Sequence, residues 1–257
     1  MLRDTVLDQA YYEQLGERFR ISQYGLSYTT MRDRALSPLR YEGVGITWVG
    51  TRYQFKPRAM VRRHFLVQSM VLTHEVSEQI ITQTMLEFLY SRHAPLRLAN
   101  DNIKLYAGGF ASVLANLKAM PGNTNNVLSH ELALTLGPSG MVQLPLRLFG
   151  LDMMLSDELQ FPLLTLLGNT PYAWALPTAF EEGGKARDWL SVGTWGTYFR
   201  VTNQVSLDIL KSIRRRGHIV KKVPYRLGYR WEFVSVAEPN LYQSGVHTVS
   251  IARIIGL

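Results

Sequence analysis

A strict two-residue alternation of apolar and polar side chains marks residues 223–233. One parity carries Val223, Tyr225, Leu227, Tyr229, Trp231 and Phe233, and the other includes Arg226, Arg230 and Glu232. This period places the two sets on opposite faces of an extended strand. In a soluble sheet the charged face would meet water, so this strand alone fits a soluble sheet as well as a membrane sheet.

The same alternation recurs along most of the chain. It predicts strands at 23–31, 42–55, 61–75, 80–92, 103–115, 128–136, 142–148, 151–167, 189–210, 223–233 and 242–257. A tight turn is predicted at 137–140, and Asp157 and Glu158 form the candidate turn within 151–167. The total is about eleven strands, or ten if 149–167 is one bent strand. Because closed bacterial barrels have even strand numbers, we predict ten to twelve.

Repeated strands of this kind, with aromatic ends and one polar face, are typical of a transmembrane β-barrel. Lipid cannot bond free backbone groups, so strands cross it only in a closed sheet with an apolar outer face. The predicted fold is therefore an all-β, antiparallel, up-and-down barrel over residues 22–257. Residues 1–21 are predicted to be an N-terminal periplasmic segment or a short helix. The alternative is a soluble, lipocalin-like barrel with the same alternation reversed, but the long strands favour the membrane barrel.

Composition agrees with a barrel and excludes several other classes. Charged residues make up 19% of the chain, and there are no cysteines, which excludes disulfides and thiolate metal sites. No apolar run reaches the length of a membrane-spanning helix. The start of the chain lacks the apolar segment of a secretory signal, so we expect export by a signal peptide absent from this chain. The net charge is +8, but the only dense run of basic residues is 214–216, which lies in a predicted hairpin turn. Nucleic acid is therefore not expected as a partner.

Five short segments carry a resemblance to a known family. They are LSPLRYEG at 36–43, LYAGG at 105–109, GNTNN at 122–126, FPLL at 161–164 and RLGY at 226–229. The chain resembles an uncharacterised family of outer-membrane β-barrels from Bacteroidota-type Gram-negative bacteria. The resemblance implies a barrel integral to the bacterial outer membrane and no mechanism. The terminal Leu257, in place of an aromatic residue, departs from the pattern of exported barrels.

Charged residues on the polar faces of the strands are the candidate functional residues. The lumen-facing candidates are Glu131, Arg147, Arg200, Arg226, Arg230 and Glu232. They are placed either to line a pore or bind an anionic solute, or to pair with one another. In barrels of this size, charges more often fill the lumen as a polar core.

Catalysis was considered at two serine and histidine groups. Ser129 and His130 are adjacent and point to opposite faces of one strand, whereas Asn240, Ser244 and His247 lie around the entry to the last strand. The histidines show no metal-ligand spacing, and neither a metal nor a cofactor is predicted. The leading prediction is a structural or interaction barrel, alone or as a subunit of a larger outer-membrane complex. The alternatives are a membrane-embedded lipid hydrolase and a narrow channel for small solutes. Outer-membrane lipid, lipopolysaccharide and other outer-membrane proteins are the expected partners.

Overall fold

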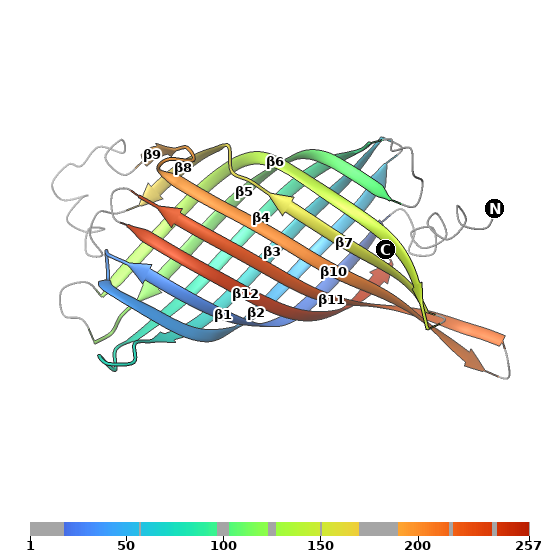
Figure 1. Ribbon diagram of the computed structural model, residues 1–257, viewed down its shortest axis with the longest axis horizontal. Coiled ribbons are helices and arrows are strands. Elements are labelled where there is room, and N and C mark those ends of the chain that lie inside the picture. The colour runs from blue at the N-terminus through green and yellow to red at the C-terminus, as the bar shows by residue number, and fades with distance from the viewer. Residues whose placement is uncertain are drawn as a thin grey trace.

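The twelve strands of this protein form one antiparallel sheet that closes on itself (Figure 1). The computed structural model describes residues 18–56, 58–96, 103–122, 127–149, 151–169, 190–215, 218–237 and 241–256. The strands are β1 (Arg18–Asp33), β2 (Ser37–Lys56), β3 (Ala59–Thr73), β4 (Ile80–Leu96), β5 (Lys104–Ala119), β6 (Leu128–Leu148), β7 (Leu151–Gln160), β8 (Leu164–Asn169), β9 (Leu190–Gly193), β10 (Tyr198–Arg215), β11 (His218–Val236) and β12 (Tyr242–Gly256).

Two pairings close the ring. β1 pairs with β12 along its whole length, from Phe19 opposite Gly256 to Asp33 opposite Tyr242, and β5 pairs with β6. The closed barrel has ten strands, and β8 and β9 are additional short pieces. β8 continues along β6 where β7 ends, and β9 lies beside β8 just before β10 begins. The predicted fold, an all-β antiparallel up-and-down barrel of ten to twelve strands, is confirmed.

The two faces of the wall distinguish a membrane barrel from a soluble one. Outward side chains are apolar and well exposed, for example Leu26 at 72% and Ile46 at 68%. Inward side chains include buried amides such as Gln23, Gln68 and Asn116. A soluble barrel has the opposite arrangement, so the lipocalin-like alternative is wrong. Closure also gives the backbone groups of the wall partners within the sheet, as lipid requires.

The predicted turn at 137–140 is wrong, because β6 runs straight through it. Gly137 and Pro138 pair with Phe110 and Gly109 of β5, where the paired glycines also lie. A Cβ on Gly137 would come within 1.9 Å of the Phe161 carbonyl oxygen. The glycines therefore mark the place where β5 and the segment between β7 and β8 approach β6 closely, a role that glycine often has in sheets. Joining 128–136 to 142–148 reduces the predicted eleven strands to ten.

The second predicted turn, at Asp157 and Glu158, is also wrong, since both residues pair with β10 inside β7. The interruption comes at residues 161–163, where the amides of Phe161 and Leu163 still bond to the carbonyls of Pro138 and Leu136. The predicted strand 189–210 is interrupted as well, because Trp195 lies in the turn between β9 and β10. Its indole Nε1 donates a hydrogen bond to the Pro162 carbonyl and links the two interruptions.

The barrel begins earlier than predicted, at Arg18 rather than at residue 22. The predicted N-terminal helix or plug within 1–17 lies outside the described residues, as do Asn240 and the terminal Leu257. Figure 1 shows that β1 begins and β12 ends at the same end of the barrel. We call this the terminal end and the other the distal end.

Candidate functional site in the barrel lumen

A network of two arginines and two glutamates crosses the middle of the lumen. Arg200 on β10 donates to both carboxylate oxygens of Glu87 on β4, at 2.8 and 3.0 Å. It also donates to Glu232 on β11 at 2.8 Å. Arg230 completes the network with bonds of 3.0 Å to Glu87 and 2.6 Å to Glu232. Since β5, β6 and β7 separate β4 from β10, these side chains meet across the lumen, not along one wall.

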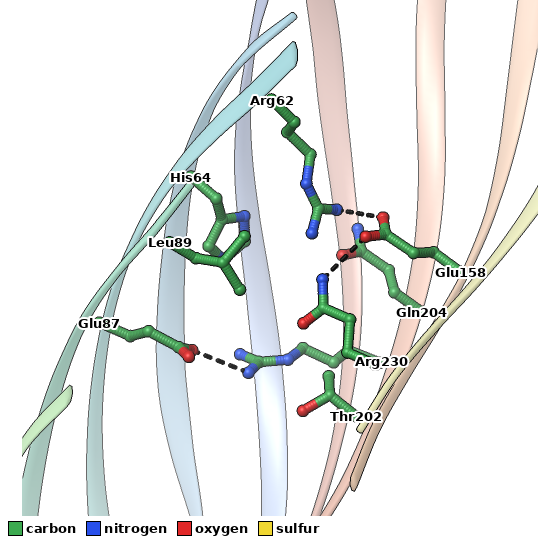
Figure 2. Close-up of a pocket in the computed structure, with 9 residues that line it drawn as sticks. Arg62, His64, Glu87, Leu89, Glu158, Thr202, Gln204 and Arg230 are labelled. Carbon is green, nitrogen blue, oxygen red and sulfur yellow. Dashed lines mark hydrogen bonds and ion pairs between the residues drawn. The ribbon is translucent and has the colours of Figure 1, made fainter. Parts of the chain in front are cut away.

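A second ion pair joins β3 to β7 nearer the terminal end. Arg62 Nη1 donates to Glu158 Oε2, and both side chains are buried. The Glu158 carboxylate also accepts bonds from Gln160 at 2.8 Å and from Ser139 at 3.3 Å. Figure 2 shows Arg62 and Glu158 facing each other at one side of a pocket, and Arg230 and Glu87 at the other. Charge-assisted bonds with several donors compensate part of the cost of burying the carboxylate.

Two further ion pairs lie in the lumen on either side of these, one between the adjacent strands β10 and β11 and one across the barrel. Toward the terminal end, Arg226 holds Asp208 in a bidentate pair at 2.5 and 2.7 Å, and its Nη1 donates to the Tyr53 hydroxyl at 3.2 Å. Toward the distal end, Lys118 on β5 donates to Asp33 on β1 at 2.6 Å. The Lys118 ammonium also lies 3.5 Å from the centre of the Tyr242 ring, a cation–π contact.

Apolar clusters cover the ion pairs at both ends of the lumen. The terminal cluster includes Phe19, Ile21, Met60, Met141 and Ile254. The distal cluster includes Met31, Leu36, Leu72, Met120 and Val236.

Two cavities beside these ion pairs each measure about 10 Å³. That volume is close to the minimum that holds one water molecule. Around these two cavities, the described side chains therefore leave room for little more than a single water molecule.

Five of the six residues singled out in the sequence lie inside the barrel, and one does not. Glu131, Arg200, Arg226 and Glu232 are buried, and the Arg230 side chain is 13% exposed. Arg147 is placed differently: its side chain is 66% exposed and lies 3.7 Å from Asp152. Residues 146–149 at the end of β6 are all exposed, so alternation there no longer separates lumen from lipid.

The sequence candidates missed the partners that complete these pairs. Glu87, Asp208, Arg62 and Lys118 were not among the selected residues, and Glu158 was assigned to a turn. Alternation could have found them, because each has apolar neighbours on both sides or lies on the polar parity of its strand. It could not have paired Glu87, Arg62 or Lys118, because their partners come from strands across the barrel, whereas Asp208 faces Arg226 on the adjacent strand. In the described lumen, the buried or nearly buried charges comprise five cations (Arg62, Lys118, Arg200, Arg226, Arg230) and six carboxylates (Asp33, Glu87, Glu131, Glu158, Asp208, Glu232).

The serine and histidine candidates do not form catalytic pairs. Ser244 is buried in the lumen, whereas His247 is exposed on the outer wall and its Nδ1 lies 2.8 Å from the Tyr229 hydroxyl. Ser129 likewise points inward, and His130 follows it on the opposite face.

One serine and histidine contact does exist inside, between Ser139 Oγ and His93 Nε2 at 2.8 Å. His93 is fully buried, and its Nδ1 has no hydrogen-bond partner among the described residues. It therefore lacks the carboxylate that orients the base of a triad.

The described residues contain no group of three or more histidine, aspartate or glutamate side chains that could hold a metal ion. Within the same part of the chain, no helix has both the length and the apolar character needed to cross a bilayer.

Comparison with protein families places the chain. A family model described as "Protein of unknown function (DUF3316)" matches residues 10–257. The chain belongs to this family. DUF3316 is described as a family of unknown function, as is the outer-membrane barrel family that the sequence resembles. An origin in Bacteroidota stays a prediction. No curated protein matches the chain.

The barrel of this DUF3316 protein is similar to several solved outer-membrane structures. It is similar to the transport unit of the autotransporter AIDA-I from Escherichia coli, with a TM-score of 0.49, 6% identity, and coverage of 99% and 96% of the two chains. It is also similar to the translocator domain of the autotransporter NalP from Neisseria meningitidis, with a TM-score of 0.44, 8% identity, and coverage of 95% and 92%. An outer-membrane channel from Pseudomonas putida F1 gives a TM-score of 0.36 at 8% identity, with coverage of 92% and 95%. Similarity at this level carries no argument about function.

Proposed function

We propose that this DUF3316 protein is an integral outer-membrane β-barrel with a closed lumen and a structural or interaction role, as a subunit of a larger outer-membrane complex. The observation that carries the proposal is the filled lumen, in which three ion pairs and the hydrogen bond from Arg226 to Tyr53 connect strands across the barrel. These contacts would have to separate before a solute could pass, and the three ion pairs would then leave buried charges without partners. Outer-membrane location is supported by the closed wall with its apolar outer face, since such barrels are the β-structures that span membranes.

The lengths of the connections support an orientation. At the terminal end, residues 57–58, 149–150 and 216–217 form three short connections, and residues 97–103 form a fourth of seven residues. At the distal end the connections range from residues 34–36 to the longest of all, residues 170–189 between β8 and β9. Outer-membrane barrels have short periplasmic turns and longer extracellular loops. The terminal end therefore faces the periplasm and the distal end faces outward. A partner protein would meet the rims or the outer wall, because the lumen offers no surface to it.

Two measurements on one purified, refolded sample test the proposal. The first is the migration of boiled and unboiled protein on a semi-native gel, where a fast unboiled band reports a folded barrel. The second is conductance in planar bilayers, where we expect no defined current steps. Steady channel openings from a heat-modifiable sample would overturn the closed lumen in favour of a solute channel. Co-purification from native outer membranes after crosslinking, with the same partner recovered repeatedly, tests the interaction role.

A further inference from the structure

Five arginines project from the outer wall near the terminal end. They lie on neighbouring strands: Arg253 on β12, Arg20 on β1, Arg52 on β2, Arg63 on β3 and Arg92 on β4, and all are exposed. The register sets Arg20 directly opposite Arg52, and Arg52 directly opposite Arg63. These three form an unbroken row across three strands, which we call the arginine row. Arg253 and Arg92 flank the row on either side. The direct partner of Arg20 on β12 is Ile255, two residues from Arg253. The direct partner of Arg63 on β4 is Tyr90, two residues from Arg92.

Among the described residues, the arginine row has no carboxylate beside it. Like charges directly opposite in a sheet destabilise it, since their Cβ atoms are only about 5 Å apart. Among the described residues, Glu42 is the only outward carboxylate of β1–β4 and β12, and it lies at the distal end of β2, where it pairs with Arg40 at 2.9 Å. Outside the backbone ladder of the sheet, no hydrogen bond or ion pair among the described residues involves the side chains of Arg20, Arg52 or Arg63. An anion from outside the protein would remove the repulsion.

An apolar groove begins beside the row and continues toward the distal end. Its volume is about 670 Å³, and its lining includes Tyr24, Leu26, Ile46, Trp48 and Ile251. On β1 only Ser22 lies between Arg20 and Tyr24 on the outer face, and on β2 only Gly50 lies between Arg52 and Trp48. The row and the groove are thus consecutive parts of one surface.

Trp48 forms the boundary between the row and the groove. Its ring lies against Gly50, where a Cβ would come within 3.1 Å of the indole, and its Nε1 donates to Ser22 Oγ at 2.9 Å. Tryptophan prefers the level of the lipid headgroups, with its ring toward the chains and its N–H toward water. The row beyond it therefore lies at the depth of the phosphates.

We propose that the arginine row binds the phosphate of an anionic phospholipid, with an acyl chain in the adjacent groove. Guanidinium groups bind phosphate through paired N–H donors, and two neighbouring arginines can share one phosphate. A basic surface at this depth also attracts a lipid with net negative charge. The inference rests on the proposed membrane insertion, and the orientation above selects the phospholipids of the periplasmic leaflet over lipopolysaccharide.

Native mass spectrometry of the refolded barrel in a non-ionic detergent tests the site, using titrations with phosphatidylglycerol and phosphatidylethanolamine. We expect phosphatidylglycerol to bind at least about tenfold more tightly, and R20Q/R52Q to weaken its binding about tenfold, equivalent to about 1.4 kcal/mol. Arg52→Lys keeps the charge but loses the paired donors, so its affinity should be intermediate. The matched control is Arg40→Gln, an exposed arginine at the distal end, which should bind phosphatidylglycerol as the unchanged protein does.

Each outcome decides the question. Equal binding of the two lipids, or unchanged binding by R20Q/R52Q, would overturn the site. Preference for lipid A over phosphatidylglycerol would also overturn it, by assigning the row to the other leaflet. The same samples are checked for heat-modifiable migration, so a failure of the lipid site with a folded barrel is separable from a failure of the barrel itself. If the double variant does not fold, Arg52→Gln alone serves in its place.

Discussion

Arginines inside the barrel and arginines on its outer wall occupy opposite electrostatic situations. Arg200 touches two carboxylates within 3.0 Å and has little access to water. Arg52 is exposed and lies between Arg20 and Arg63 with no described carboxylate in contact. The fold thus supplies the counter-charges of the interior itself, whereas no described carboxylate neutralises the exterior row.

The contrast predicts where a substitution will affect the barrel and where it will affect lipid contact. Removing one member of a buried pair leaves an uncompensated charge in a region that water does not reach. Removing an exposed arginine from a row of like charges takes away repulsion and no partner. Interior changes should therefore alter the free energy of unfolding, and exterior changes should alter its dependence on lipid composition.

The largest effect is expected for Arg200→Met. It leaves Glu87 and Glu232 with Arg230 as the sole neighbouring cation, and breaking a buried ion network of this kind costs about 3–5 kcal/mol. The measurement is urea unfolding of the barrel in phosphatidylcholine vesicles, followed by tryptophan fluorescence. Arg147→Met is the control, because that side chain is 66% exposed, and it should change the free energy of unfolding by less than about 0.5 kcal/mol. Equal stability of the two variants would contradict an interior held by its ion pairs.

A charge placed on the apolar outer wall should have the next largest effect. Ile46→Arg puts a guanidinium between Trp48 and Val44, within the band that faces the acyl chains, at a cost of about 2–4 kcal/mol. Leu39→Arg lies near the distal end of β2 and should cost at most about 1 kcal/mol. The same urea titration compares them. If Ile46→Arg were as stable as Leu39→Arg, the outer wall would not be in contact with lipid chains.

A pair of tyrosines compares the two faces with the same chemical change. Tyr53→Phe removes the hydroxyl that accepts a bond from Arg226, a charged donor in the lumen, and should cost about 1.5–3 kcal/mol. Tyr24→Phe removes a hydroxyl from the outer wall, where the side chain is 65% exposed, and should have little effect. Similar changes in unfolding free energy for both variants would show that the Arg226 contact contributes nothing specific.

Alternation along the chain was enough to predict the barrel wall, because a period of two is a local property of each strand. It correctly put the apolar parity of residues 225–233 outside, with Arg226 and Glu232 inside. It failed at Gly137, where glycine and proline indicate a turn, although in the structure Gly137 allows a close approach of Phe161, which lies between β7 and β8. It also failed at Arg147, since alternation continues past the edge of the lumen.

The pairs themselves could not be predicted from sequence. Glu87 and Arg200 are separated by 113 positions and meet because closure sets β4 and β10 on opposite walls. Local patterns carry no information about which strands face one another after closure. They therefore cannot predict whether the charged side chains of the lumen line a pore or form a packed core. The arginine row was equally hidden, because each arginine belongs to a different strand and only the register aligns them.

The smallest expected effect concerns that row, and its sign is what matters. In phosphatidylcholine vesicles, Arg52→Gln should raise the free energy of unfolding by up to about 1 kcal/mol, because the like charges of Arg20 and Arg63 lose their neighbour. Arg40→Gln should lower it by up to about 1 kcal/mol, because it removes the exposed ion pair with Glu42. When phosphatidylglycerol is added, the effect of Arg52→Gln should reverse to destabilising, while that of Arg40→Gln stays the same. A loss of stability for Arg52→Gln that is equal in both lipids would mean that the guanidinium has a partner within the protein, and the contrast between the two faces would no longer hold.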